Sequence, residues 1–343
     1  MRIALIAPPW IPVPPPGYGG TELVIDTLAR ELSSTGHQVV LATTGDSTCP
    51  VKRTWVYDHA RTADMGDTVI ELTHVLHAYQ AIGDADIIHD HTVAGPALAS
   101  QRPTPPVVTT NHAPFTEDAR RYYRALGDHV PILAISHHQA STSGDVPIAR
   151  VIHHGIDQNR YPVGPGGDYL VFDGRMSPEK GVRQAIDIAQ RAGVPLVIAA
   201  KMRATSERDY FEAEVKPRLG GDIQYVGEVD RNHKLGLVGD ALVLLNPIRW
   251  DEPFGLNMIE ALACGTPVIA TPRGAAPEIV DHGITGYLAT TTDQAVAAIA
   301  WATELDRRAC RTAAETRFSA HRMAGDHLAL YRDIINRHTR AAA

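Results

Sequence analysis

The stretch from Trp250 to Glu260 reads Trp-Asp-Glu-Pro-Phe-Gly-Leu-Asn-Met-Ile-Glu, and it predicts a tight turn followed by a helix. A continuous apolar run at 241–246 comes just before it, as expected of a parallel strand buried on both faces. Gly255 marks the turn, and Gly265 is typical of a helix end. A strand that leads directly into a helix is the repeating unit of a doubly wound α/β sheet.

The same alternation of short apolar runs and segments of helical period extends along the chain. Residues 20–35 have a helical spacing that stops at Gly36, so they predict a βαβ unit with the runs on either side. The predicted strands of the first half lie at 2–7, 38–43, 86–89, 106–110, 132–135 and 150–153. Those of the second half lie at 169–173, 195–199, 222–226, 241–246 and 266–271.

The two halves are separated by a segment rich in proline and glycine, at 157–168, which has the composition of a linker. A chain of 343 residues also exceeds what one hydrophobic core usually serves. The sequence therefore predicts a first Rossmann-like domain at 1–160 and a second at 161–320. A helical segment follows at 321–343.

Composition excludes several classes of protein. The net charge is −7 and no long basic run occurs, which argues against a nucleic-acid partner. Three widely spaced cysteines argue against a disulfide framework or a zinc site. No apolar run approaches the roughly 20 residues of a membrane-spanning helix, and strand-like sequence follows Met1 directly. We expect a cytoplasmic protein, and the sequence leaves its oligomeric state and any peripheral membrane contact open.

The start of the helix after Gly255 is suited to a phosphate group. The free amides of Gly255, Leu256 and Asn257 and the helix dipole both favour an anion there. Glu252 lies just ahead of the helix and Glu260 a little over one turn inside it. Either glutamate alone would be interpreted as a solvated carboxylate, but beside a phosphate site the pair is placed to hold sugar hydroxyls.

A second motif follows another predicted strand and reads Phe172-Asp-Gly-Arg-Met-Ser-Pro-Glu-Lys-Gly181. Arg175 and Lys180 flank a turn at the carboxyl end of the sheet, where open α/β folds bind ligands. A guanidinium fork and an ammonium suit a diphosphate. The chain has few lysines, so Lys180 is informative here, although an ion pair with Glu179 is the alternative interpretation.

These motifs resemble those of the retaining glycosyltransferases of family 4, which have the GT-B fold. In that fold two Rossmann-like, doubly wound parallel-sheet domains face each other across a cleft, and the C-terminal helix returns to the first domain. Further matches span nearly the whole chain in the expected order. They are Gly19-Gly-Thr-Glu22, Ile152-His-His-Gly-Ile-Asp157, Ala263-Cys-Gly-Thr-Pro-Val268 and Gly274-Ala-Ala-Pro-Glu278.

The resemblance implies roles for the residues of the second domain. Arg175 and Lys180 neutralise the diphosphate of a nucleotide-sugar donor, and Glu260 binds its ribose. Glu252, with the amides that begin the helix, holds the sugar to be transferred. Lys201 is a departure from the family pattern, and either adds charge near the diphosphate or faces solvent.

In the first domain, the resemblance assigns Gly19 and Gly20 to the donor. His112, which follows a predicted strand, matches the histidine of the family that contacts the donor sugar. The proline-rich loop at 8–18 carries Trp10 and Tyr18, whose rings we expect to stack on an acceptor.

The implied reaction is transfer of a hexose from a nucleoside-diphosphate sugar, with UDP-glucose as the default donor. It requires no cofactor and no metal. The low lysine content is typical of a GC-rich, actinobacterial genome, in which an oligosaccharide antibiotic and a cell-envelope glycan are equal candidates for the acceptor. Two alternatives stay open: a GT-B-like epimerase or phosphorylase, and a nucleotide-sugar-binding protein without turnover.

Other motifs are weaker. Asp84-Ala-Asp86 has the form of a metal-binding Asp-x-Asp triplet, but it is better interpreted as a helix end and a strand start. His89 and His91 alternate along a predicted strand and could ligate a metal only with a third ligand. The first strand is followed by a proline-rich loop instead of Gly-x-Gly-x-x-Gly, which argues against a dehydrogenase.

Overall fold

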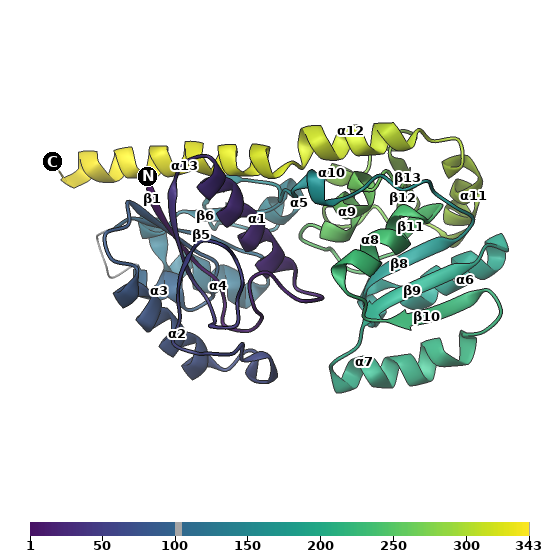
Figure 1. Cartoon of the computed structure of the whole chain (residues 1–343), viewed down its shortest axis with the longest axis horizontal. Helices are drawn as coiled ribbons and strands as arrows, with labels where there is room; N and C mark the ends of the chain where they lie inside the picture. Colours follow the sequence, from purple (N-terminus) through teal and green to yellow (C-terminus); the bar gives the residue numbers. More distant parts are fainter. Residues whose placement is uncertain (100–104, 343) are drawn as a thin grey trace. The chain divides into compact units, whose positions relative to one another are not determined.

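The computed structural model describes residues 1–99 and 105–342 of the chain (Figure 1). The chain folds into two compact units. Unit 1 comprises Met1–Gly155 together with Ala320–Ala343, and unit 2 comprises Ile156–Ser319.

Unit 1 contains a seven-stranded sheet in the order β3-β2-β1-β4-β5-β6-β7, with every neighbouring pair parallel. Because β1 pairs with both β2 and β4, the strand order reverses between β1 and β4. Ligands of doubly wound sheets bind beyond the carboxyl ends of the strands at such a reversal. The strands are β1 (Arg2–Ile6), β2 (Gln38–Ala42), β3 (Lys52–Thr54), β4 (Ile87–Asp90), β5 (Val107–Thr110), β6 (Ile132–Ala134) and β7 (Ile148–Val151).

Helices cover both faces of this sheet. Ala4 and Ile6 of β1 pack against Ala78 and Ile82 at the end of α2, and the intervening residues point to the opposite face. The helices are α1 (Gly20–Ser34), α2 (Thr68–Ala81), α3 (Gly95–Ala99), α4 (Glu117–Ala125), α5 (His137–Ser141) and α13 (Ala320–Ala342), with short 3₁₀ turns at Thr62–Asp64 and Gly127–His129.

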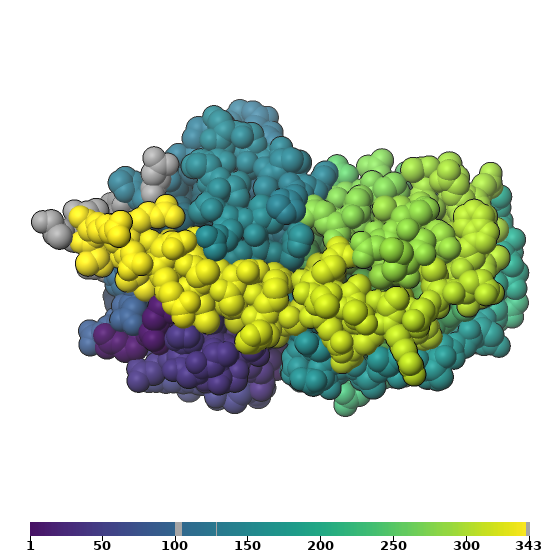
Figure 2. Space-filling view, turned by 90° about the horizontal axis from the view of Figure 1, so that it is seen from above, coloured from purple at the N-terminus to yellow at the C-terminus, as the bar shows by residue number. Residues whose placement is uncertain are grey.

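The long C-terminal helix α13 is part of unit 1. It packs against α1, and Tyr331 at its centre is fully buried. In Figure 2, α13 (yellow) lies between the purple N-terminal segment and the teal segment of the same unit. An apolar stripe that includes Leu328 and Ile334 gives the helix its buried face.

Unit 2 repeats the architecture with six parallel strands in the order β10-β9-β8-β11-β12-β13. The order reverses between β8 and β11, so the unit has a switch point of its own. The strands are β8 (Leu170–Arg175), β9 (Leu196–Lys201), β10 (Ile223–Gly227), β11 (Val243–Asn246), β12 (Val268–Ala270) and β13 (Gly286–Leu288).

Two helix pairs flank the unit 2 sheet. Helices α6 and α11 pack on each other over one hydrophobic core, and α9 packs against α12. The α-helices are α6 (Val182–Ala192), α7 (Thr205–Tyr210), α8 (Arg231–Gly239), α9 (Leu256–Ala263), α10 (Ala276–Ile279), α11 (Thr292–Ala302) and α12 (Arg307–Arg317). Short helical turns lie at Gln158–Arg160, Pro178–Lys180 and Lys216–Arg218, and a π-helical turn at Phe211–Val215.

The predicted fold class, two doubly wound parallel α/β units, is confirmed, and most predicted strands are shifted by only one or two residues. Two strands were missed, β3 and β13, and both are edge strands of three residues. The sequence of β3, Lys-Arg-Thr, has no apolar run because an edge strand is only half covered. In β13 the strand begins with a glycine, which weakens the strand signal.

The predicted linker at 157–168 is a packed part of unit 2, so that interpretation was wrong. The amide of Gly164 donates to the carbonyl of Cys264, and Arg307 donates to the carbonyl of Gly164. A Cβ atom at Gly164 would lie 2.2 Å from the backbone of Gly239. The glycines here allow close backbone approach and do not make the segment flexible.

The remaining sequence predictions concern cysteines and membrane spans. All three cysteines are buried and free, as predicted. Among the described residues, no helix is both long enough and apolar enough to cross a membrane.

Candidate active site

The motif residues of unit 2 gather at its switch point. Arg175 is the last residue of β8, Asn246 is the last residue of β11, and these two strands are neighbours in the sheet. The turn that ends at Lys180 follows β8, and the loop that carries Glu252 follows β11. Because these strands are parallel, both motifs lie at the same edge of the sheet.

Lys180 and Glu252 form an ion pair within this edge, between Nζ and Oε1. Both side chains are largely buried, with 8% and 12% of their side-chain surface exposed. The ring of Trp250 lies beside the ammonium, 5.7 Å from Nζ to the ring centroid. The second carboxylate oxygen of Glu252 is buried and has no hydrogen-bond partner in the described part of the chain. A buried carboxylate oxygen of this kind is suited to accept a hydrogen bond from a ligand hydroxyl.

Helix α9 begins at the same edge. Gly255 has φ 106°, a left-handed conformation that favours glycine, and it directs the chain into the helix. The amides of Gly255, Leu256 and Asn257 make no hydrogen bond among the described residues. The side chain of Asn257 is already engaged, since it donates to the carbonyl of Asp173 at 3.0 Å. What Asn257 can offer a ligand is therefore its backbone N–H group.

Glu260 is held from two sides. Its Oε1 accepts from the hydroxyl of Tyr161 at 3.0 Å, and its Oε2 accepts from the ammonium of Lys234 at 2.7 Å. Lys234 also lies 3.8 Å from Asp173. A carboxylate offers about four lone-pair sites, so Glu260 keeps acceptor capacity for a vicinal diol.

The charges of this cluster are fixed by its surroundings. Burial alone would lower the pKa of Lys234, but the nearby carboxylates of Glu260 and Asp173 raise it above its ordinary value. Burial, together with the negative charge of Glu260, raises the pKa of Tyr161 well above its usual range. At neutral pH Lys234 is charged and Tyr161 is a hydrogen-bond donor.

The two other predicted cations are paired with acids. Arg175 donates to Glu179 at 2.6 Å, so the partner of Glu179 is Arg175 and not Lys180. Lys201, at the end of β9, donates to Glu207 at 2.9 Å and is mostly buried. The structure thus places Lys201 next to Arg175 in the sheet register and not in solvent.

The remaining predicted residues lie in unit 1, after β1 and β5. Gly19 and Gly20 begin α1, Trp10 is half-buried, and Tyr18 is 39% exposed. Glu22, in the first turn of α1, is buried, and its burial raises the pKa of the carboxyl to about 7.

His112 belongs to a histidine cluster, which we define as His89, His91, His112, His154 and His327. The rings of His89 and His91 lie 4.0 Å apart, and His112 stacks on His154 at 5.3 Å between ring centroids. Burial lowers the pKa of His112 and of His327 to about 4, and lowers the pKa of His91 well below its ordinary value. These rings are neutral at pH 7.

A hydrogen bond fixes the tautomer of His112. Its Nε2 lies 2.9 Å from Nδ1 of His91, and Nε2 of His91 is buried without a partner in the described chain. A buried N–H without an acceptor is rarer in proteins than an under-used acceptor, so the proton of His91 is on Nδ1. His112 then accepts this bond, carries its own proton on Nδ1 and can donate it.

The structure does not support metal binding at the two weak motifs. Both ring nitrogens of His89 face hydroxyl groups, Nδ1 that of Tyr331 at 2.6 Å and Nε2 that of Thr110 at 2.7 Å. Asp84 and Asp86 lie within 3.7 Å of the guanidinium of Arg2, so the Asp-x-Asp triplet has a positive partner already.

Comparison with known families identifies the chain. The model of glycosyltransferase family 4 matches residues 18–160, and that of the glycosyl transferases group 1 matches residues 157–317. The chain belongs to the family 4 glycosyltransferases. The fold is GT-B, as the resemblance of the motifs implied.

Individual relatives agree with this assignment. The glycogen synthase of Mycobacterium tuberculosis is 33% identical over 166 residues, 46% of this chain and 39% of that relative, so the match spans about two fifths of its length. The structure of AviGT4, a glycosyltransferase involved in avilamycin A biosynthesis, is 26% identical with a TM-score of 0.78 over 98% of both chains. Sucrose-phosphate synthase of Thermosynechococcus elongatus shows the same fold at 22% identity, with a TM-score of 0.80 over the whole of both chains.

Sequence reasoning missed two residues of these sites, Tyr161 and Lys234, and it considered His91 only as a metal ligand. The partner of Tyr161 in the cluster is 99 positions away along the chain. The scarcity of lysine could have drawn attention to Lys234, one of five in the chain, but no local motif surrounds it.

Proposed function

We propose that this family 4 glycosyltransferase transfers a hexose from a nucleoside-diphosphate sugar to an acceptor, with retention of configuration. UDP-glucose is the first donor to test. The observation that carries the proposal is the switch point of unit 2, where the buried pair Lys180–Glu252 lies beside the unbonded amides that begin α9.

Each part of a donor has a matching group at this edge. Lys180, Arg175 and the α9 amides are suited to the diphosphate. The unpartnered oxygen of Glu252 is suited to a hydroxyl of the sugar. Glu260, oriented by Lys234 and Tyr161, is suited to the ribose diol.

In the proposed reaction the bond from the anomeric carbon to the diphosphate oxygen breaks while the acceptor oxygen bonds to that carbon. The acceptor proton passes to a phosphate oxygen of the leaving group. Negative charge grows on the diphosphate, and Lys180, Arg175 and the amides stabilise it. The Nδ1–H group of His112 donates a hydrogen bond to a hydroxyl oxygen of the sugar.

We further propose that the reaction needs no metal ion and takes place in the cytoplasm. The positive charge that the leaving diphosphate requires is supplied by two cationic side chains and a helix N-terminus. Activity in EDTA is therefore expected to equal activity without it.

For the acceptor, the similarity to AviGT4 supports an oligosaccharide antibiotic, because that protein is described as acting in avilamycin A biosynthesis. A cell-envelope glycan is the other candidate. We propose that Trp10 and Tyr18 supply a stacking surface for the acceptor.

Calorimetric titration with UDP, GDP, dTDP and ADP in EDTA tests the donor site. We expect one nucleotide to bind wild type clearly more tightly than the rest, and Glu260→Ala to weaken it. Glu304→Ala, which removes an exposed glutamate of unit 2, is the matched control and should bind as wild type does. If no nucleotide binds, the proposed function is wrong.

Turnover separates the proposal from the two alternatives. A glycosyltransferase consumes the donor only when an acceptor is added, apart from slow hydrolysis. Conversion of UDP-glucose alone into another nucleotide sugar would indicate an epimerase. Tight binding without turnover, across acceptors of both classes, would indicate a binding protein.

A further inference from the structure

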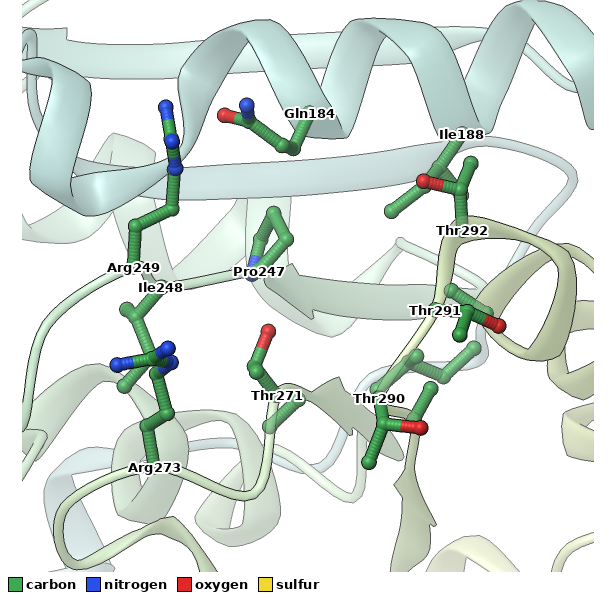
Figure 3. Close-up of a pocket in the computed structure, with 14 residues that line it drawn as sticks. Gln184, Ile188, Pro247, Ile248, Arg249, Thr271, Arg273, Thr290, Thr291 and Thr292 are labelled. Carbon is green, nitrogen blue, oxygen red and sulfur yellow. The ribbon is translucent and has the colours of Figure 1, made fainter.

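A pocket lies in unit 2, beyond the carboxyl ends of β11, β12 and β13 (Figure 3). We call it the strand-end pocket. Its volume is about 270 Å³, just below the usual range of ligand sites. Helix α6 forms one wall through Gln184 and Ile188, and the loops after β11 and β12 form another.

Arginines and threonines line the strand-end pocket, but the hydroxyls of Thr290 and Thr291 are already bonded to Gln294. Figure 3 shows Arg249 and Arg273 on one side, threonines at the start of α11 on the other, and the hydroxyl of Thr271 pointing into the space between them. Arg273 has one acidic neighbour, Asp251 at 3.9 Å. The guanidinium of Arg249 makes no hydrogen bond or ion pair within residues 1–99 and 105–342.

Several neutral polar groups of the strand-end pocket are also without partners in the described chain. The amide oxygen of Gln184 is buried and unbonded. The hydroxyls of Thr271 and Thr292 make no hydrogen bond there either. Buried polar groups are normally satisfied, so the buried, unbonded amide oxygen of Gln184 indicates a polar ligand, and the exposed guanidinium of Arg249 lines the same pocket.

The strand-end pocket is separate from the donor site. None of the residues that line the strand-end pocket is among the predicted donor residues. Residues of α6 and α11 line this pocket, whereas Glu260 lies on α9. The two sites share backbone, however. The amide of Arg249 donates to the carbonyl of Glu179, and the carbonyl of Glu252 accepts from Ala275.

From this arrangement we propose that the strand-end pocket binds a small phosphate monoester with free hydroxyl groups, of the hexose phosphate class. Arg249 and Arg273 hold the phosphate through charge-assisted hydrogen bonds. Gln184, Thr271 and Thr292 bind the hydroxyls. The volume is suited to a monosaccharide phosphate. The site does not depend on the proposed function of the donor site.

Calorimetric titration with glucose 6-phosphate, in the presence of saturating UDP, tests this site. We expect glucose 6-phosphate to bind while UDP occupies the donor site. Arg249→Ala and Arg273→Ala should each raise its Kd at least about tenfold, the effect of losing a hydrogen bond to a charged group. Thr271→Val should weaken it less, because that bond is between a hydroxyl and a neutral group.

Arg183→Ala is the matched control. Arg183 precedes Gln184 on α6 but pairs with Glu214 at 3.0 Å, and it does not line the strand-end pocket. This variant should bind glucose 6-phosphate as wild type does. Glucose should not bind, and inorganic phosphate should bind more weakly than glucose 6-phosphate.

Three results would overturn the proposal: no binding of glucose 6-phosphate, its displacement by UDP, or equal binding by wild type and both arginine variants. If glucose binds as tightly as glucose 6-phosphate, the phosphate contacts are disproved. If inorganic phosphate binds as tightly as glucose 6-phosphate, the hydroxyl contacts are disproved. If the protein binds no UDP but still binds glucose 6-phosphate through Arg249, the donor site is contradicted and the strand-end pocket is not.

Discussion

Lowering the pH from 7.5 to 5.5 is expected to destabilise unit 1 selectively, because of its histidine cluster. His112 and His327 have a pKa of about 4 in the folded chain, lowered by burial from the ordinary 6.5. His74, buried against β1, is lowered to the same value. Between pH 6.5 and 4 the unfolded chain binds protons that the folded chain does not, so stability is full above pH 6.5 and falls as the pH decreases.

The magnitude follows from the two pKa values. At pH 5.5, one unit below the unfolded value, each of these three histidines costs about 1.4 kcal/mol, or about 4 kcal/mol together when they titrate independently. The pKa of His89, His91 and His154 is lowered further by burial, so these rings act in the same direction. The buried carboxyls of Glu22 and Asp90 act in the opposite direction, because their pKa values are raised to about 7 and about 6, so they offset part of this cost over the same range. Domains are stable by about 5–15 kcal/mol, so the histidine contribution is still large on that scale.

Hydrogen exchange with mass spectrometry measures this effect in each unit separately. Peptides from β4 and α13 report on unit 1, and peptides from β8 and β11 report on unit 2. Between pH 7.5 and 5.5, the wild-type peptides of β4 and α13 should lose protection, and those of β8 and β11 should lose much less. Both are corrected for the intrinsic exchange rate. His327→Leu removes one titrating ring, so the stability of unit 1 should decrease over this range by about 1.4 kcal/mol less than in wild type.

His233→Leu is the matched control, because His233 is exposed on α8 of unit 2. It should leave the pH dependence of unit 1 unchanged. Equal loss of protection in both units, or a His327→Leu protein with the same pH dependence as wild type, would show that the buried histidines do not set the pH dependence of unit 1.

Three further predictions concern single side chains. Glu22 has a folded pKa of about 7, so the stability that its protonated form contributes is full below pH 4.5 and is lost as the pH rises through 7. Urea unfolding gives the free energy of unfolding of Glu22→Gln minus that of wild type, and this difference should be larger at pH 8 than at pH 5 by roughly 3 kcal/mol. The same difference at both pH values would contradict this. Lys234→Met leaves Glu260 and Asp173 without their shared cation, so it should lower the stability of α9 by about 3 kcal/mol, as measured by hydrogen exchange. Unchanged protection of α9 would argue against the ion pairs of Lys234. Trp10→Ala should raise the KM of the acceptor and spare that of the donor in steady-state kinetics, and a rise in the donor KM alone would disprove the acceptor assignment.

The sequence predicted the edge of unit 2 well because its signals are local. Arg175 and Lys180 lie within one turn, as do Gly255 and the amides after it, and parallel strands bring such turns to the same edge. The topology brings Lys180 and Glu252, 72 positions apart, to this edge, but their direct contact was not predicted.

The parts that were not predicted depend on contacts between distant segments. Tyr161 reaches Glu260, and Tyr331 in the last helix reaches His89 in β4, without any motif that marks either pair. The glycines near 164 were interpreted as a linker because composition cannot distinguish glycine needed for flexibility from glycine needed for close packing. That distinction depends on the neighbouring backbone at Gly239.

In the proposed donor site, Lys180 and its surroundings bind the diphosphate of a nucleotide-sugar donor. Calorimetric titration with UDP and UMP measures this binding most directly, on wild type, on Lys180→Ala and on the control Lys216→Ala, which removes an exposed lysine paired with Glu212. We predict that Lys180→Ala raises the Kd of UDP at least about tenfold, about 1.4 kcal/mol, and changes that of UMP much less. Lys216→Ala should match wild type. UDP binding by Lys180→Ala within twofold of wild type would show that Lys180 does not bind the diphosphate.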